Sequence, residues 1–130
     1  MTSQPEKATL RAIAPHFAVD EVVAAAEYYR DVLGFEILSY FLDPPVFAMV
    51  ARDGIEIHLG QADAGQTALP NSFYRSIGLD AYIWVSNVAA LAQELTERGA
   101  DIIDGPVVRV YGSTEIVVRD LNGYKIAFGE

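Results

Sequence analysis

The sequence contains no cysteine, and histidine is nearly as scarce, since only His16 and His58 occur among its 130 residues. Without thiols, a disulfide framework and a thiolate metal site are both excluded. The core must therefore form without cross-links. A hydrophobic fraction of 52% is sufficient for that in one domain of this length, 1–130.

Basic residues are few, because nine Lys and Arg stand against eighteen Asp and Glu, which gives a net charge of −9. Nucleic acids and anionic membrane surfaces are bound by clustered positive charge, so the composition argues against both partners. The negative charge has two readings that stay open. It serves solubility, or it attracts a cationic ligand.

Long apolar runs are absent as well. No stretch approaches the roughly 20 residues that cross a bilayer. The first ten residues, MTSQPEKATL, lack the basic segment and apolar run of a signal peptide. These observations predict a cytoplasmic protein.

What the sequence does contain is a repeat. The stretch DGIEIHLGQ at 53–61 has the same frame as NGYKIAFGE at 122–130, although Ala127 stands where the first copy has His58. The matched pairs are Gly54 and Gly123, Ile57 and Ile126, Gly60 and Gly129, and Gln61 and Glu130. The chain therefore reads as two copies of one unit.

Each copy begins with a strand that leads into a helix. Strands are expected over 10–19 and 80–85, and apolar residues at helical spacing follow each of them. The candidate N-caps are Asp20 and Asn87, and the glycines expected to end the helices are Gly34 and Gly99.

Three further strands are expected after each helix. In the first half they cover 35–41, 46–52 and 55–60, and in the second half 107–112, 114–120 and 124–129. The order is β-α-β-β-β twice. The halves cover about 8–61 and 76–130, and the polar segment 62–75 joins them.

Three stretches carry a family resemblance: VDEVVAAAEYYRDVLGFEI, GIEIHLG and VRDLNGYKIAFGE. Together they resemble the glyoxalase/bleomycin-resistance superfamily, also called the vicinal oxygen chelate superfamily. The resemblance extends from about residue 8 to the end. It implies an α+β fold in which two tandem βαβββ modules form a curved mixed sheet cup with helices on the outer face. It also implies a homodimer.

Strand alternation then predicts which side chains face the helices and which face the cup. The apolar residues at alternate positions are assigned to the helix side: Ile13, Phe17, Val19, Ile55, Ile57, Leu59, Ala81, Ile83, Val85, Tyr124, Ile126 and Phe128. The candidate ligand-binding residues on the cup side are His16, Glu56, His58, Asp80, Tyr82, Trp84 and Lys125. This set forms either an ordinary solvated sheet face or a ligand pocket.

Metal-dependent members of the resembled family hold a divalent ion at four positions. By alignment these positions are Ala14, His58, Asp80 and Ala127, and two of the four have no donor atom. We therefore expect no metal cofactor. If a metal is bound, His58 and Asp80 would hold it.

The resemblance is closest in pattern to the bleomycin-resistance-like members that lack a metal. It implies a metal-independent protein that binds a small molecule, with Tyr82 and Trp84 offering faces to a cationic or aromatic compound. The alternative is a lyase, isomerase or dioxygenase. Such an enzyme would use His58 as catalytic acid or base, oriented by Asp80 or Glu56, or as a ligand of a divalent metal. A partner domain with an unused cup is a third reading.

Overall fold

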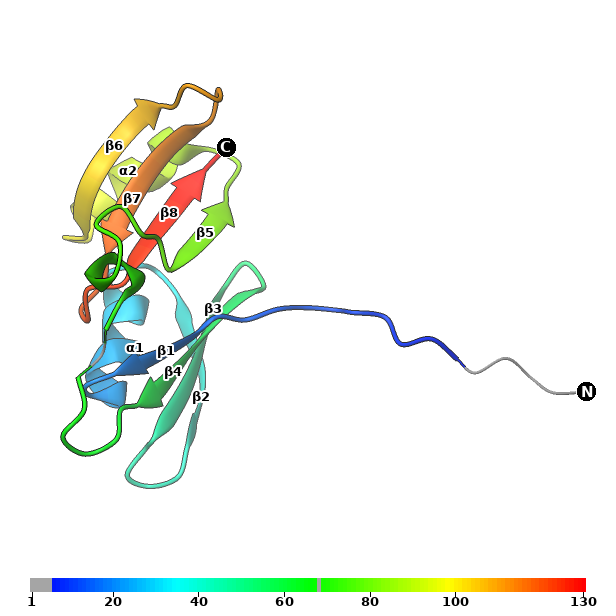
Figure 1. Cartoon of the computed structure of the whole chain (residues 1–130), viewed down its shortest axis with the longest axis vertical. Coiled ribbons are helices and arrows are strands. Elements are labelled where there is room, and N and C mark those ends of the chain that lie inside the picture. Colours follow the sequence, from blue (N-terminus) through cyan, green and yellow to red (C-terminus); the bar gives the residue numbers. More distant parts are fainter. Residues whose placement is uncertain (1–5, 68) are drawn as a thin grey trace, which may run out of the picture.

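The computed structural model describes residues 6–67 and 69–130. The first module contains β1 (His16–Val19), α1 (Val22–Asp31), β2 (Glu36–Phe41), β3 (Phe47–Arg52) and β4 (Ile55–Gln61). A 3-10 helix, η1 (Asn71–Phe73), lies in the connection. The second module contains β5 (Ala81–Trp84), α2 (Val88–Glu97), β6 (Asp101–Val108), β7 (Thr114–Arg119) and β8 (Lys125–Gly129). The predicted α+β fold of two tandem βαβββ modules is confirmed (Figure 1).

The strands form two mixed sheets of four strands, ordered β1-β4-β3-β2 and β5-β8-β7-β6. In each sheet the first strand pairs in parallel with the last, and the other pairs are antiparallel. A parallel pair needs a crossover connection, which the helix and two strands between them supply. The register places His16 beside His58 in the first sheet and Tyr82 beside Ala127 in the second.

The predicted alternation accounts for the core. One face of each sheet packs on its helix, and the side chains of that face are buried. Examples from β1, β4 and β8 are Phe17, Val19, Ile57, Leu59, Ile126 and Phe128. Ala81, Ile83 and Val85 are partly buried against the same core. We refer to the opposite face of each sheet as its open face.

Two strand predictions were wrong. The first strand begins at His16 and not at residue 10, so Ile13, which was assigned to the core, is 92% exposed. The Pro15 carbonyl accepts a hydrogen bond from His58 N, but proline has no N–H to extend the pairing. Residues 6–14 run away from the body of the molecule (Figure 1). Ile55 was also assigned to the core, but it begins β4 beside a turn and is 46% exposed.

The other error concerns the strand expected over 107–112. β6 instead covers Asp101–Val108, because its register against β7 shifts twice and so accommodates residues that rarely occur in strands. Residues 109–112 form the turn into β7, in which Gly112 N donates to Arg109 O.

The two helices begin in different ways. Asn87 caps α2 as predicted, since its side chain accepts from Ala90 N at 3.0 Å. Asp20 does not cap α1. Instead Gln61, at the end of β4, accepts from Val22 N at 3.0 Å. Both helices end as predicted, at glycines with positive φ, Gly34 and Gly99.

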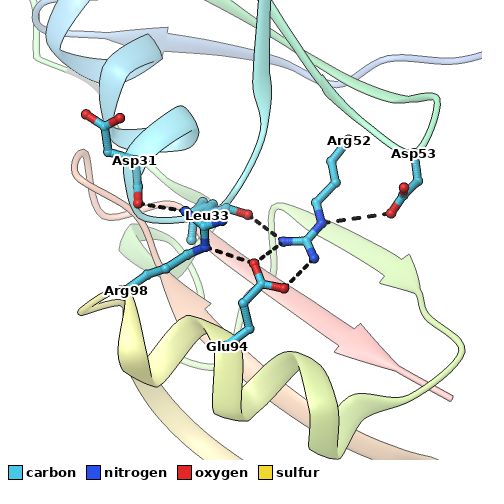
Figure 2. Close-up of polar contacts among 6 residues, drawn as sticks. All are labelled: Asp31, Leu33, Arg52, Asp53, Glu94 and Arg98. Carbon is cyan, nitrogen blue, oxygen red and sulfur yellow. Dashed lines mark hydrogen bonds and ion pairs between the residues drawn. The ribbon is translucent and has the colours of Figure 1, made fainter.

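Charged side chains connect the modules (Figure 2). Arg52 donates to the Leu33 carbonyl at 2.9 Å and to both carboxylate oxygens of Glu94 at 2.9 and 2.6 Å. Arg98 donates to Glu94 at 2.9 Å and to the Asp31 carbonyl at 3.2 Å. The end of α1 and the end of β3 are thereby held against α2. No helix among the described residues is long and apolar enough to span a membrane.

Candidate functional site

The open face of the first sheet brings three of the predicted residues together. His58 Nδ1 lies 3.1 Å from His16 Nε2, and His58 Nε2 lies 2.9 Å from Glu56 Oε1. The parallel register explains this contact, because it places the two histidines on neighbouring strands and on the same face. We call this row of side chains the Glu56–His58–His16 chain.

Access to the chain is lowest at His58 and greater at both of its ends. The side chain of His58 is 17% exposed, that of Glu56 is 43% exposed, and His16 is an exposed residue. The Phe47 ring borders both imidazoles, with ring centroids 5.9 Å from His16 and 5.5 Å from His58. The face therefore combines an apolar wall with polar atoms that a ligand can reach at the His16 end.

The open face of the second sheet is built around a carboxylate that the sequence interpretation missed. Glu115 on β7 is 3% exposed. Its Oε2 accepts from the hydroxyls of Tyr82 at 2.7 Å and Tyr111 at 2.8 Å, and its Oε1 accepts from Arg109 Nε at 3.0 Å. We call these four residues the Glu115 cluster. Trp84 lies beside it, with a ring-centroid distance of 4.7 Å to Tyr82.

Hydrogen bonds fix the protonation states in this cluster. Burial acts to raise the pKa of Glu115, but hydrogen bonds from Tyr82, Tyr111 and Arg109 outweigh it, so the pKa lies below its ordinary value. The hydrogen bond with Glu115 raises the pKa of Tyr111. For Tyr82, the contact with Ser113 acts to lower the pKa. The hydrogen bond to Glu115 and burial together outweigh that contact, so the pKa of Tyr82 lies above its ordinary value. At neutral pH the cluster therefore holds a carboxylate and two neutral phenols.

A hollow of about 560 Å³ opens above this cluster. Its walls are Tyr82, Trp84, Tyr111, Gly112, Ser113, Glu115 and Glu130. Gly129 makes the arrangement possible, because a β-carbon there would collide with the Tyr82 hydroxyl. The indole of Trp84 is 77% exposed at the rim. The volume lies within the range of small-molecule sites.

A second hollow, also of about 560 Å³, lies between the modules near the Arg52–Glu94 pair. Leu33, Phe35 and Leu91 contribute apolar walls, and Ala90 borders it from α2. Trp84 borders this hollow too. A change in Trp84 fluorescence therefore does not by itself show which hollow binds a ligand. Variants that alter only one of the two hollows make that distinction.

Asp80 and Lys125 have a different role from the other predicted residues. Asp80 Oδ1 accepts from Asn71 N at 2.8 Å, and its Oδ2 accepts from Lys125 N at 2.9 Å. Lys125 Nζ donates to the Ser76 carbonyl at 2.9 Å. Both side chains hold the connection 71–80 against the second sheet. That connection exposes Phe73 and Tyr74.

The four aligned metal positions do not fit a divalent ion. Ala14 and Ala127 have no donor atom, and both Asp80 oxygens are occupied by backbone N–H groups. His58 has each ring nitrogen within hydrogen-bonding distance of a neighbour. Within residues 6–67 and 69–130, no group of three or more His, Asp or Glu side chains could hold a metal.

One signal in the sequence points to the missed carboxylate. In the expected strand TEIVVRD, Glu115 alternates with the apolar core residues Ile116 and Val118 in the same way that Tyr82 does with Ile83. An acidic residue inside an otherwise apolar strand needs donors nearby. Tyr111 and Arg109 come from the turn, and no local pattern connects them to Glu115.

Comparison with known proteins gives a family match. The sequence matches the family model described as Glyoxalase/Bleomycin resistance protein/Dioxygenase superfamily over residues 12–128. A comparison with curated proteins gave no match.

Solved structures share the fold. TioX from Micromonospora sp. ML1 has a TM-score of 0.73 at 21% identity, over 92% of this chain and 98% of that one. A glyoxalase-related enzyme from Clostridium phytofermentans has a TM-score of 0.75 at 14% identity, over 97% and 98%. The bleomycin-binding protein from bleomycin-producing Streptomyces verticillus, solved with copper(II)-bleomycin, has a TM-score of 0.68 at 21% identity, over 94% and 97%. At these identities the likeness extends to the fold alone.

Proposed function

Because this chain belongs to the Glyoxalase/Bleomycin resistance protein/Dioxygenase superfamily, we propose that it binds a small cationic or aromatic molecule without a metal ion. The observation that carries the proposal is the hollow above the Glu115 cluster. Three aromatic side chains and two carboxylates line it. A site of this composition suits a flat molecule with positive charge.

The energetics favour such a ligand. Each aromatic face that meets a cation contributes about 0.5–2 kcal/mol. Glu115 and Glu130 border the hollow, and the guanidinium of Arg109, which pairs with Glu115, leaves the carboxylate of Glu130 as an excess of negative charge. The net charge of −9 raises the local concentration of cations around the protein. One solved structure with the same fold is a bleomycin-binding protein, and this supports small-molecule binding as the role of the present chain.

Titration with proflavine, a flat aromatic cation, tests the proposal through Trp84 emission. We expect saturable quenching, and weaker binding by Tyr111→Ala, which removes one wall of the hollow. Ala90→Leu narrows only the inter-module hollow and serves as the control. Unchanged emission with proflavine and related aromatic cations would remove this function. If Ala90→Leu weakens proflavine binding and Tyr111→Ala does not, the ligand binds in the inter-module hollow instead.

We also propose that the protein acts as a homodimer. Residues 6–15 extend away from the body of the molecule (Figure 1). Leu10 is 98% and Ile13 92% exposed there, and apolar side chains so exposed favour contact with a second copy. Sedimentation equilibrium is expected to give a dimer that Leu10→Asp with Ile13→Asp weakens. A monomeric wild type would refute the dimer.

One observation favours the alternative, an acid–base lyase or isomerase. The carboxylate of Glu56 lies 2.9 Å from His58 Nε2, an arrangement that orients catalytic histidines. The variant His58→Gln separates the two functions. If His58 is catalytic, the variant should lose turnover by about 10²–10⁴-fold. If the protein only binds its ligand, the variant should show a modest change in ligand affinity.

A further inference from the structure

The three hydroxyl groups that line the hollow above the Glu115 cluster keep their protons inside the protein. The Glu115 carboxylate can only accept, so Tyr82 and Tyr111 both donate to its Oε2, at 2.7 and 2.8 Å. The Ser113 hydroxyl lies 3.1 Å from the Glu130 carbonyl oxygen and 3.1 Å from the Tyr82 hydroxyl oxygen. Its proton goes to one of these two oxygens, because the Tyr82 proton is already bound to Glu115. None of the three hydroxyls therefore has a proton left for a ligand.

The hydroxyl oxygen of Tyr111 is a free acceptor on the wall of the hollow. A phenol oxygen that donates its proton still accepts through its lone pairs. The Tyr82 oxygen already has the Ser113 hydroxyl within 3.1 Å. For Tyr111, no group within residues 6–67 and 69–130 donates to the oxygen, and the residue is 69% exposed. A ligand in the hollow can therefore reach this oxygen and donate to it.

Charge and an aromatic face lie beside this acceptor. The Glu130 carboxylate accepts from Val88 N only at 3.4 Å, so it keeps most of its capacity for a cation. The one side-chain N–H on the walls belongs to Trp84, and it lies in the plane of the indole. A flat cation stacked on the face of Trp84 does not meet that donor. The walls thus offer such a ligand a π face, a negative charge and a free acceptor.

We propose that Tyr111 Oη accepts a hydrogen bond from the ligand, so that the hollow selects flat cations with N–H groups at their edge over fully alkylated ones. The inference rests on the proposed function and narrows its ligand class to protonated aromatic amines and amidines. Stacking and charge attract both kinds of cation, whereas the hydrogen bond requires an N–H. This preference is opposite to that of a purely aromatic cage, which suits quaternary ammonium groups.

Two dyes with the same ring system test the selection at pH 7. Proflavine has two primary amino groups, and acridine orange has the same groups fully methylated, while both dyes are flat cations at this pH. Isothermal titration calorimetry measures the two affinities. We expect proflavine to bind roughly tenfold more tightly, as one hydrogen bond implies.

Three variants assign the preference to Tyr111. Tyr111→Phe removes the acceptor and keeps the ring, so proflavine should bind roughly tenfold less tightly while acridine orange changes little. Tyr40→Phe removes an exposed phenol hydroxyl from the other module and should leave the ratio of affinities unchanged. Glu130→Gln keeps an accepting oxygen but removes the charge, so it should weaken both dyes alike.

The outcomes separate the inference from the proposed function. Equal affinities for the wild type, or a ratio that survives in Tyr111→Phe, overturn the acceptor role and leave the proposed function standing. A surviving ratio would assign the preference to the bulk of the methyl groups. Loss of both dyes in Tyr111→Phe would assign the hydroxyl to building the wall and would also overturn the selection. Failure of both dyes to bind the wild type removes the proposed function, and the inference with it.

Discussion

At the scale of single residues, Glu115 illustrates how a carboxylate is accommodated inside an apolar strand. An unpaired carboxylate at 3% exposure would be strongly destabilising. Here Tyr82 and Tyr111 donate to one oxygen and Arg109 donates to the other. The same bonds hold the phenols in place as walls of the hollow, so one residue contributes to both stability and binding.

The variant Glu115→Gln tests this account. The amide keeps one accepting oxygen but turns an NH₂ group toward a donor, so the free energy of unfolding should fall by about 1–3 kcal/mol. Proflavine affinity should fall with it. The measurement is urea denaturation, with Glu27→Gln as a control because Glu27 is exposed on α1. Equal stability of the Glu115 variant and the control would contradict the assigned role.

At the scale of elements, the last strand of each module stabilises the start of its own helix. Gln61 at the end of β4 accepts from Val22 N at 3.0 Å, and Glu130 after β8 accepts from Val88 N at 3.4 Å. These are equivalent positions of the two repeats. The duplicated strand therefore repeats a structural function as well as a sequence, and in the first module it replaces the cap expected from Asp20.

Removing the first of these contacts should weaken α1. For Gln61→Ala we expect a loss of about 1 kcal/mol in the free energy of unfolding, the usual effect of losing an N-terminal cap. The control is Gln66→Ala, an exposed glutamine in the connection. Thermal unfolding followed by circular dichroism compares the two. A Gln61 variant as stable as the control would show that the α1 terminus needs no cap.

At the scale of the whole molecule, side chains from distant parts of the sequence connect the modules. Tyr29 on α1 donates to Asp120 at 2.6 Å, and Tyr124 stacks on Phe17 with centroids 4.3 Å apart. The Arg52–Glu94 pair adds a bidentate contact (Figure 2). The relative placement of the modules thus depends on a few long-range contacts.

The Arg52–Glu94 contact makes stability depend on pH. The hydrogen bond from Arg52 lowers the pKa of Glu94 below 4.5 in the folded state. The stabilisation is therefore complete above about pH 4.5 and is lost as the pH falls through the folded-state pKa. The Glu94 side chain is 34% exposed, so the contribution is about 1 kcal/mol or less.

The variant Glu94→Gln should be less stable than the wild type by that amount at pH 7. The difference should shrink as the pH falls below about 4.5 and approach zero once the pH is below the lowered folded-state pKa, because the wild-type carboxyl is then protonated. Denaturation series from pH 3 to pH 7 measure it, with Glu97→Gln on the exposed side of α2 as the control. A difference that does not depend on pH would contradict the assignment.

Most of the fold could be predicted from local pattern. The repeat, the helix ends at Gly34 and Gly99, and the buried set around Ile57 and Ile126 all follow from spacing along the chain. The errors occurred where distant partners decide. β1 begins late because nothing in the described chain pairs with its expected first half, and β6 differs in its bounds because its register against β7 shifts twice.

By itself the sequence determined the two modules and, within the regular strands that were correctly bounded, the face on which most residues lie, because a strand alternates every residue whatever surrounds it. Only the tertiary structure decided which open-face residues meet. His16 contacts His58 because β1 and β4 pair in one parallel register. Tyr82 reaches Glu115 across β8 over Gly129. Alternation is a property of the local chain, whereas register and crossing depend on contacts between segments tens of residues apart.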